Sequence, residues 1–137
     1  MIKALAHVCL LSRDLERTLD FYCGTLGLQK KFDFIRKGEL FGFYLEVAPN
    51  QFIEVFKGDT AAEPQGRRIT HFCLEVENIG AVREKLVSHG IVVTEKKKGS
   101  DESWQIWCKD PDGTDIEFHE YTAESSQITG TRCIVTW

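Results

Sequence analysis

Two histidines and two glutamates recur at matching positions in this sequence. His7 lies in the string AHVCL, and His71 lies in the similar string THFCL. Glu54 and Glu117 close the same two segments, each following its histidine by nearly the same number of residues. Imidazole nitrogens and carboxylate oxygens are common ligands of divalent metal ions. The recurrence therefore predicts a metal site built from His7, Glu54, His71 and Glu117.

Strand periodicity gives these four residues a common orientation. Side chains at positions i and i+2 of a strand share a face, so each glutamate projects from the face opposite its hydrophobic neighbours. Taken singly, each of the four is more simply a solvated or satisfied side chain. Four such residues in a duplicated frame favour a metal site, because coordination offsets the free-energy cost of burying charge.

Three neighbouring side chains are expected to line the same pocket. Leu11 and Cys9 share the face of the first histidine, and Cys73 shares that of the second. The simpler interpretation of both thiols is that they are small apolar residues in the wall of the pocket. The alternative is a redox or metal-ligand role. His119, two residues after a glutamate, could be a pocket acid or support a ligand, but a surface residue near the end of a strand is the more ordinary interpretation.

Composition narrows the class of protein. The chain has 137 residues, 42% hydrophobic and 28% charged, with a net charge of −4, as in ordinary soluble domains. The acidic balance argues against nucleic-acid binding, and no apolar stretch is long enough to cross a membrane. The N-terminal residues show no signal-peptide pattern, so we expect a cytoplasmic protein. Five cysteines without a CxxC pair indicate reduced, buried thiols.

Hydrophobic spacing predicts a βαβββ module that occurs twice. The first helix is expected from about Asp14, its N-cap, to Gly24, and the second from Asn78 to a stop at Gly90. Three strands are expected after each helix: residues 29–35, 40–46 and 51–57, then 91–96, 103–109 and 114–121.

The predicted fold class is α+β, with the two modules forming an open, curved mixed-sheet barrel around the metal site. Residues 1–122 form one domain, with modules at about 1–62 and 66–122. The tail, residues 123–137, could dock on a partner subunit, cover the mouth of the barrel or pack loosely.

Several strings in residues 4–121 resemble the vicinal oxygen chelate superfamily, which includes glyoxalase I, extradiol dioxygenases and bleomycin-resistance proteins. They are HVCL, DLERTLDFY, LGL, THF and DPDGTDIE. The glyoxalase I group uses a His, Glu, His, Glu ligand set, and those positions fall on His7, Glu54, His71 and Glu117. The resemblance also implies a homodimer.

Substrate contacts of that group match less well. Its glutathione-binding arginine and asparagine correspond to Leu11 and Gly58 here, so two polar anchors are missing. Arg67 stands where eukaryotic-type members carry an arginine. The resemblance therefore implies that Arg67, Leu11, Cys9 and Cys73 line a pocket whose substrate differs.

The implied reaction isomerises the hemithioacetal of a 2-oxoaldehyde and a thiol such as glutathione. Zn, Ni, Co, Mn or Fe(II) would stabilise an enediolate, and Glu117, or else Glu54, would act as general base. The product would be a thioester of a 2-hydroxy acid. We expect a small-molecule substrate and no nucleic-acid or membrane partner.

Two alternatives remain open. An extradiol dioxygenase has a 2-His-1-carboxylate iron site and should tolerate the loss of Glu54. A metal-free module of the bleomycin-resistance type would sequester a hydrophobic drug or ligand, with the four residues as an inherited relic.

Overall fold

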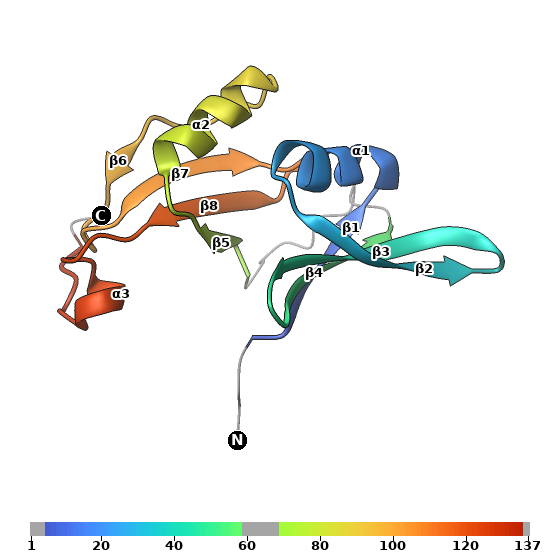
Figure 1. The fold of residues 1–137 in the computed structure, drawn as a ribbon, viewed down its shortest axis with the longest axis horizontal. Helices are drawn as coiled ribbons and strands as arrows, with labels where there is room; N and C mark the ends of the chain where they lie inside the picture. Colours follow the sequence, from blue (N-terminus) through green and yellow to red (C-terminus); the bar gives the residue numbers. More distant parts are fainter. Residues whose placement is uncertain (1–4, 59–68, 136–137) are drawn as a thin grey trace. The chain divides into compact units, whose positions relative to one another are not determined.

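The computed structural model describes residues 5–58 and 69–135 of the chain. The chain divides into two compact units, Met1–Gly66 (unit 1) and Arg67–Trp137 (unit 2), and each contains one four-stranded sheet (Figure 1). Arg67 and the neighbouring residues 59–66 lie outside the described ranges. Both units are α+β and follow the expected βαβββ order, so the predicted fold class is confirmed.

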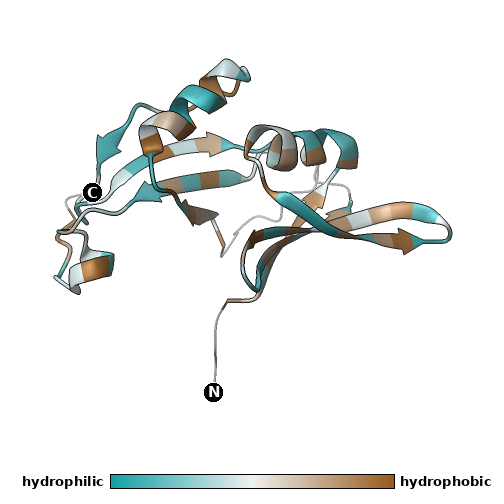
Figure 2. Ribbon diagram, viewed as in Figure 1, coloured by the Kyte–Doolittle hydropathy of each residue, from teal (hydrophilic) through white to brown (hydrophobic). Residues whose placement is uncertain are grey.

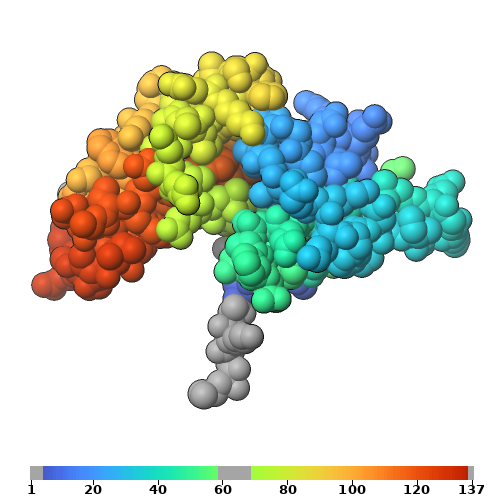
Figure 3. All heavy atoms as spheres, in the orientation of Figure 1, coloured from blue at the N-terminus to red at the C-terminus, as the bar shows by residue number. Residues whose placement is uncertain are grey.

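In unit 1 a mixed sheet carries a short helix on one face. The sheet has the order β1-β4-β3-β2, with β1 parallel to β4 and the other neighbours antiparallel. The β2–β3 hairpin, cyan to green in Figure 3, extends well beyond the helix of this unit. The elements are β1 (His7–Ser12), α1 (Leu15–Leu19), the π-helical η1 (Asp20–Thr25), β2 (Gln29–Arg36), β3 (Glu39–Ala48) and β4 (Gln51–Lys57).

The first helix begins as predicted and ends differently. Asp14 caps it, accepting a 3.1 Å hydrogen bond from the Arg17 backbone N–H. After Leu19 the helix widens into π geometry, and the Leu26 N–H reaches the Phe21 carbonyl at 3.0 Å. The expected end at Gly24 therefore falls inside η1, and the chain leaves the helix at Gly27, which has a φ of 81°.

Unit 2 repeats the plan, but its edge strand β6 has only two residues. Its sheet has the order β5-β8-β7-β6, with β5 parallel to β8. Asn78 caps the helix by accepting from the Ala81 N–H at 3.0 Å, and Gly90 ends it with a φ of 74°, as predicted. The elements are β5 (His71–Glu75), α2 (Ile79–Ser88), β6 (Lys97–Lys98), β7 (Trp104–Lys109), β8 (Asp115–Glu120) and α3 (Ser126–Thr129).

The strand predicted at residues 91–96 is wrong. In that segment Val93 forms a single bridge to Cys108, and the first strand after α2 is β6, which begins only at Lys97. The side chain of Arg83 explains part of the difference, because its Nε donates to the Thr94 carbonyl at 3.0 Å. That carbonyl is therefore bound by a helix side chain and not by a neighbouring strand.

Each sheet buries one face against its own helix. Packing places α1 on β4 in unit 1 and α2 on β7 and β8 in unit 2. Along the strands, apolar residues alternate with polar ones, as the banded colouring of β7 and β8 in Figure 2 shows. The most buried strand residues are Phe43, Leu45, Ile53 and Val55 in unit 1 and Ile106, Ile116 and Phe118 in unit 2.

The start of the C-terminal segment packs against the loop before β7. The Ser126 N–H donates to the Asp101 carbonyl at 2.8 Å, and the Gln127 amide donates to the Asp101 carboxylate at 2.6 Å. Ser125 is fully buried and accepts from the Ser103 hydroxyl at 3.0 Å. Of the alternatives for the tail, loose packing is thus excluded for residues 125–127. No helix in residues 5–58 or 69–135 is long and apolar enough to span a membrane.

Candidate functional site

In unit 1, the predicted metal ligands His7 and Glu54 lie side by side on the sheet face away from α1. They stand on the adjacent parallel strands β1 and β4, and His7 Nε2 is 3.8 Å from Glu54 Oε2. The other ring nitrogen of His7, Nδ1, lies 2.9 Å from the Tyr44 hydroxyl. This contact engages one ring nitrogen and leaves Nε2 directed at the carboxylate.

Unit 2 repeats this arrangement with different supporting residues. His71 Nε2 is 3.4 Å from Glu117 Oε2, on the adjacent parallel strands β5 and β8. Nδ1 of His71 lies 2.9 Å from the Thr70 hydroxyl, and its ring meets the Trp107 ring edge-on at 4.7 Å. Each histidine therefore has a hydroxyl group at Nδ1 and a glutamate at Nε2.

The spacing within each pair fits divalent-metal coordination. Two ligand atoms held about 2.1 Å from one tetrahedral ion lie about 3.4 Å apart. The nitrogen–oxygen distances of 3.8 Å and 3.4 Å are close to this value and longer than a good hydrogen bond. With side chains 17% and 12% exposed, Glu54 and Glu117 are partly withdrawn from water, which favours binding of a cation.

The two cysteines beside these pairs are more exposed than we expected. All five cysteines are free, as predicted, but Cys9 and Cys73 are exposed and only Cys108 is buried. The physical reason is that they lie on the open face of each sheet, not on the face that packs against a helix. Both point along that face with the histidines, in agreement with strand periodicity.

Neither thiol is activated as a nucleophile. Desolvation, followed by a hydrogen bond and the charge of Glu54, raises the pKa of Cys9 to about 11. Desolvation and the charge of Glu117 raise the pKa of Cys73 to about 12, although a hydrogen bond to the His119 backbone opposes the shift. Because the thiolate is the reactive form, both cysteines are weak nucleophiles at neutral pH.

His119 is a functional candidate that the surface interpretation missed. It is only 8% exposed, and its Nε2 lies 2.9 Å from Glu117 Oε1. Its Nδ1 is 4.0 Å from the Asp101 carboxylate, and its ring packs edge-on against Tyr121. The i, i+2 spacing from Glu117 was the available signal, because it places both side chains on one face.

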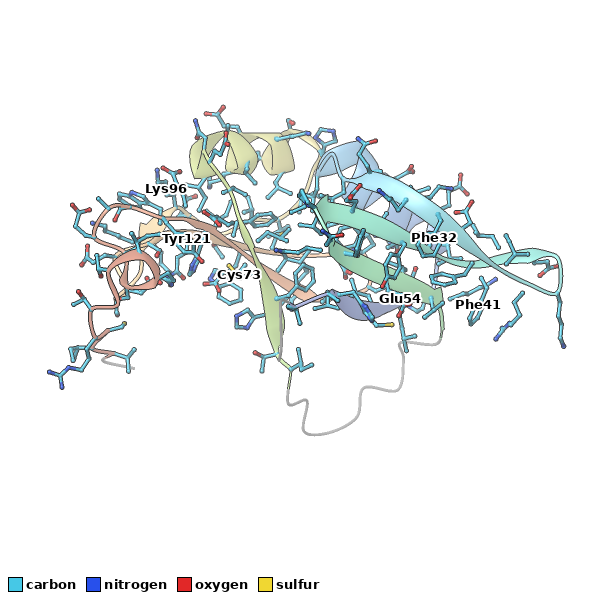
Figure 4. The ribbon with its side chains drawn as sticks, turned by 60° about the horizontal axis from the view of Figure 1, so that its bottom comes forward. Phe32, Phe41, Glu54, Cys73, Lys96 and Tyr121 are labelled. Carbon is cyan, nitrogen blue, oxygen red and sulfur yellow. The ribbon has the colours of Figure 1, made fainter. Side chains whose placement is uncertain are left out.

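The open face of unit 1 is covered with aromatic rings. Phe32 stacks on Tyr44 with ring centroids 4.7 Å apart, and Phe34 meets Phe56 at 4.7 Å. Phe41 extends the group by stacking on Phe56, and Phe52 lies tilted against Tyr44 at 5.1 Å. In Figure 4, Phe41 lies beyond Glu54 toward the tip of the β2–β3 hairpin, so the rings continue from the His7–Glu54 pair along the sheet. We call Phe32, Phe34, Phe41, Tyr44, Phe52 and Phe56 the aromatic face.

Of the remaining predicted contact residues, Leu11 lies within the described part of the chain and Arg67 does not. Leu11 lies on the same face of β1 as His7 and is 51% exposed, so it is accessible to a ligand. Its side chain lies against Gly58, where an added Cβ would come within 3.0 Å of it. Arg67 falls outside the described residues and stays a prediction.

Comparison with known proteins assigns this sequence to a family. The sequence matches the family described as Glyoxalase/Bleomycin resistance protein/Dioxygenase superfamily over residues 4–118. No curated protein matches the sequence.

Three solved structures illustrate the shared fold. A glyoxalase family protein from Enterococcus faecalis has a TM-score of 0.72 and 23% identity, covering 86% of this chain and 98% of that one. The antibiotic-binding protein TnmS3 from Streptomyces sp. CB03234 has a TM-score of 0.73 and 19% identity, and the match covers 88% of this chain and 98% of that one. A lactoylglutathione lyase from Agrobacterium tumefaciens has a TM-score of 0.66 and 18% identity, and the match covers 87% of this chain and 94% of that one. With the family matched over most of its length and the fold shared, this chain belongs to the glyoxalase/bleomycin resistance protein/dioxygenase superfamily.

Proposed function

We propose that this protein is a divalent-metal-dependent isomerase of the glyoxalase I type. Its ligand set would be His7, Glu54, His71 and Glu117, so that each unit supplies one histidine and one glutamate. The observation that carries the proposal is that both units present the same pair at coordination distance, 3.8 Å and 3.4 Å apart. The lactoylglutathione lyase fold among the similar structures supports it.

The metal would supply Lewis-acid polarisation of two adjacent substrate oxygens. Glu117 is the better candidate for the base, because it lies in the more enclosed pair and has His119 at its second oxygen. Its carboxylate would take the proton from the carbon that carries the hydroxyl and the sulfur and return it to the neighbouring carbon, the former carbonyl carbon. The hydroxyls of Tyr44 and Thr70 would keep the histidines oriented.

Substrate choice would follow from the aromatic face and Leu11. The polar anchors that hold glutathione in related enzymes correspond here to Leu11 and Gly58. An apolar wall at that position favours a hemithioacetal, or another substrate with adjacent oxygens, that carries a flat or hydrophobic group. We therefore propose a thiol adduct less polar than that of glutathione.

Metal content tests the proposal directly. Elemental analysis of the protein after loading with Mn²⁺, which prefers carboxylate and imidazole ligands, is expected to give about one Mn²⁺ ion per chain, which is lost in His71→Ala and His7→Ala. His89→Ala is the matched control, because His89 is exposed and its Nδ1 lies 2.8 Å from the Lys85 carbonyl at the end of α2. Absence of metal and of uptake after adding Ni, Zn, Mn or Fe(II) would refute the enzyme.

Activity is the second readout. Methylglyoxal or phenylglyoxal with glutathione, or with a smaller hydrophobic thiol, is expected to give thioester only when the metal is present. Phenylglyoxal and the hydrophobic thiol should be the better pair, because they match the apolar wall. Ring cleavage of a catechol in air, retained in Glu54→Gln, would identify an extradiol dioxygenase in its place.

The aromatic face favours a second candidate function, the metal-free binding of a planar hydrophobic molecule. Six aromatic rings in contact, of which Phe32 is 45% exposed, form a stacking surface of the kind that holds flat ligands. One structurally similar protein, TnmS3, binds an antibiotic. Tight binding of a planar aromatic compound to metal-stripped protein, weakened in Phe32→Ala, would support this function.

A further inference from the structure

Unit 2 contains a cluster of metal-ligating side chains beyond the four-residue set. The Sγ of Cys73, a carboxylate oxygen of Glu117 and a ring nitrogen of His119 all lie within 4.8 Å of one another. Strand register produces the cluster, because Cys73 pairs with Glu117 across β5 and β8, and His119 follows two residues along β8. Figure 4 labels Cys73 at this position on β5. All three side chains therefore stand on adjacent strands of a single sheet.

The imidazole of His119 is the second and independent observation. Its Nε2 is buried and makes no hydrogen bond to any described residue, although Glu117 Oε1 lies 2.9 Å away as an ion-pair contact. A buried polar atom without a partner is costly, so a native structure that keeps one needs a reason. This nitrogen lies next to the Glu117 carboxylate, and a nitrogen of the same ring is within 4.8 Å of the Cys73 sulfur, as a shared metal ion would require.

The surroundings of the ring resemble those of histidine ligands in general. Metal-bound histidines usually have a carboxylate or carbonyl behind the nitrogen that does not bind the metal. Here Asp101 Oδ2 lies 4.0 Å from Nδ1 of His119, and the Gln127 amide and Ser103 backbone hold that carboxylate in place. The position of the carboxylate is thus set by the start of the C-terminal segment.

We infer that unit 2 binds a divalent ion of borderline softness, of the Zn²⁺ type, through Cys73, Glu117 and His119. A thiolate, an imidazole and a carboxylate form a ligand set that such ions accept, with a fourth position for water. Binding replaces the S–H bond of Cys73 by a sulfur–metal bond and releases one proton to solvent. This goes beyond the proposed function, whose four metal ligands include neither Cys73 nor His119.

Glu117 belongs to both sets, and its two oxygens point in different directions. Oε2 lies toward His71 at 3.4 Å, whereas Oε1 lies toward His119 at 2.9 Å. The thiolate set requires no residue from unit 1. Ligand preference then separates the sets, because a harder ion such as Mn²⁺ favours carboxylate and imidazole, and a softer ion favours the thiolate.

Unit 1 provides an internal control. Cys9 pairs with Glu54 across β1 and β4, just as Cys73 pairs with Glu117. Two residues after Glu54, however, the chain has Phe56 in place of a histidine. Unit 1 thus carries the thiol and the carboxylate without the third ligand, and we expect no thiolate–metal bond there.

Titration of the metal-free full-length protein with Co²⁺ tests the inference. A thiolate bound to Co²⁺ gives an intense near-ultraviolet charge-transfer absorption that a site of only nitrogen and oxygen ligands lacks. We expect this band in the wild type, its loss in Cys73→Ser and its persistence in Cys9→Ser. His119→Phe should weaken Co²⁺ binding by roughly tenfold or more, since even outer ligand-supporting groups contribute that much.

Variants of unit 1 separate this inference from the proposed function. His7→Ala and Glu54→Gln remove half of the four-residue set, and the charge-transfer band should survive in both. Circular dichroism and a melting curve show that each variant is folded, and Cys73→Ala repeats the thiol deletion with a different side chain.

Two results would overturn the inference and leave the four-residue set intact: Co²⁺ uptake in the wild type without the band, or a band that survives in Cys73→Ser. Loss of the band in His7→Ala would also overturn it, because the site would then need unit 1. Absence of any Co²⁺ uptake would refute both sites.

Discussion

The two units share one plan and differ in what covers their open faces. Each places a His–Glu pair on adjacent parallel strands with a cysteine beside the glutamate. Around that common core, unit 1 has the aromatic face, whereas unit 2 has His119 and Asp101 close to its pair. The difference teaches that strand register repeats the His–Glu pair in both units, while the neighbouring positions decide which side chains surround it.

Facing positions on the next strand show the divergence in detail. Tyr44 lies opposite Glu54, and Trp107 lies opposite Glu117, so both glutamates have an aromatic neighbour. One step along, Gly42 faces Phe56, and an added Cβ at this glycine would come within 2.1 Å of the Val55 carbonyl oxygen and 2.8 Å of the Phe56 ring. Glycine at position 42 of β3 therefore leaves the space that the Phe56 ring of the aromatic face occupies.

The largest expected effect separates the two glutamates. If Glu117 is the base, Glu117→Gln should lower kcat about 10²–10⁴-fold, the range lost when a general base is removed. Glu54→Gln should bind metal more weakly but lose less in kcat at saturating metal. Steady-state kinetics over a range of metal concentrations measures both variants, and equal losses in kcat would show that the units do not divide these roles.

The next prediction compares the two faces of one sheet. Phe43 is fully buried against the helix side, so Phe43→Ala should lower the free energy of unfolding by about 3–5 kcal/mol. Phe32 is 45% exposed on the aromatic face, and Phe32→Ala should cost less than about 1 kcal/mol. Urea denaturation gives both values. A large loss in Phe32→Ala would mean that the aromatic face supports the fold.

Thiol reactivity compares the units at high pH. The raised pKa values, about 11 for Cys9 and about 12 for Cys73, leave little thiolate at pH 8.5. Alkylation of both should be roughly tenfold or more slower in the native protein than in urea, and should accelerate as the pH rises past 10. Mass spectrometry of the labelled peptides measures the rates.

The same shifts affect stability. Because the folded state holds these thiol protons more tightly, its stability should fall as the pH rises above the ordinary thiol pKa of 9.0. Added Zn²⁺ should slow alkylation of Cys73 further and leave Cys9 unchanged. Protection of both cysteines by the metal would contradict the difference between the units.

The smallest effect concerns the helix caps. Asp14→Ala should lower the free energy of unfolding by about 1 kcal/mol, the usual value for a lost side-chain cap. Asn78→Ala should cost less, because the Glu120 carboxylate accepts a second hydrogen bond from the Ile79 N–H at 2.7 Å. Thermal unfolding of the two variants makes the comparison, and an equal loss would show that Glu120 contributes little to capping.

Local signals predicted what depends on local physics. Asp14 and Asn78 are side-chain caps, Gly27 and Gly90 have positive φ, and strand alternation placed the glutamates opposite the buried faces. Each of these features is determined by a few consecutive residues, so a single sequence reveals it.

Features that depend on distant residues were missed. The β-branched run at residues 91–94 indicates a strand, but Arg83 on α2 takes the Thr94 carbonyl. Burial of His119 depends on the segments that carry Asp101 and Tyr121, and the exposure of Cys9 and Cys73 depends on which face α1 and α2 cover. Tertiary packing decides all of these outcomes.

The separation of buried and open faces has an evolutionary consequence. Residues on the helix side, such as Phe43 in unit 1 and Ile116 in unit 2, form the buried core of each unit, so the residues that would meet a ligand are expected to contribute little to stability. Selection can then replace open-face residues one at a time without crossing the stability threshold that removes most mutants. In such a scaffold new binding preferences arise by drift across one surface, while an inherited frame stays constant beneath it.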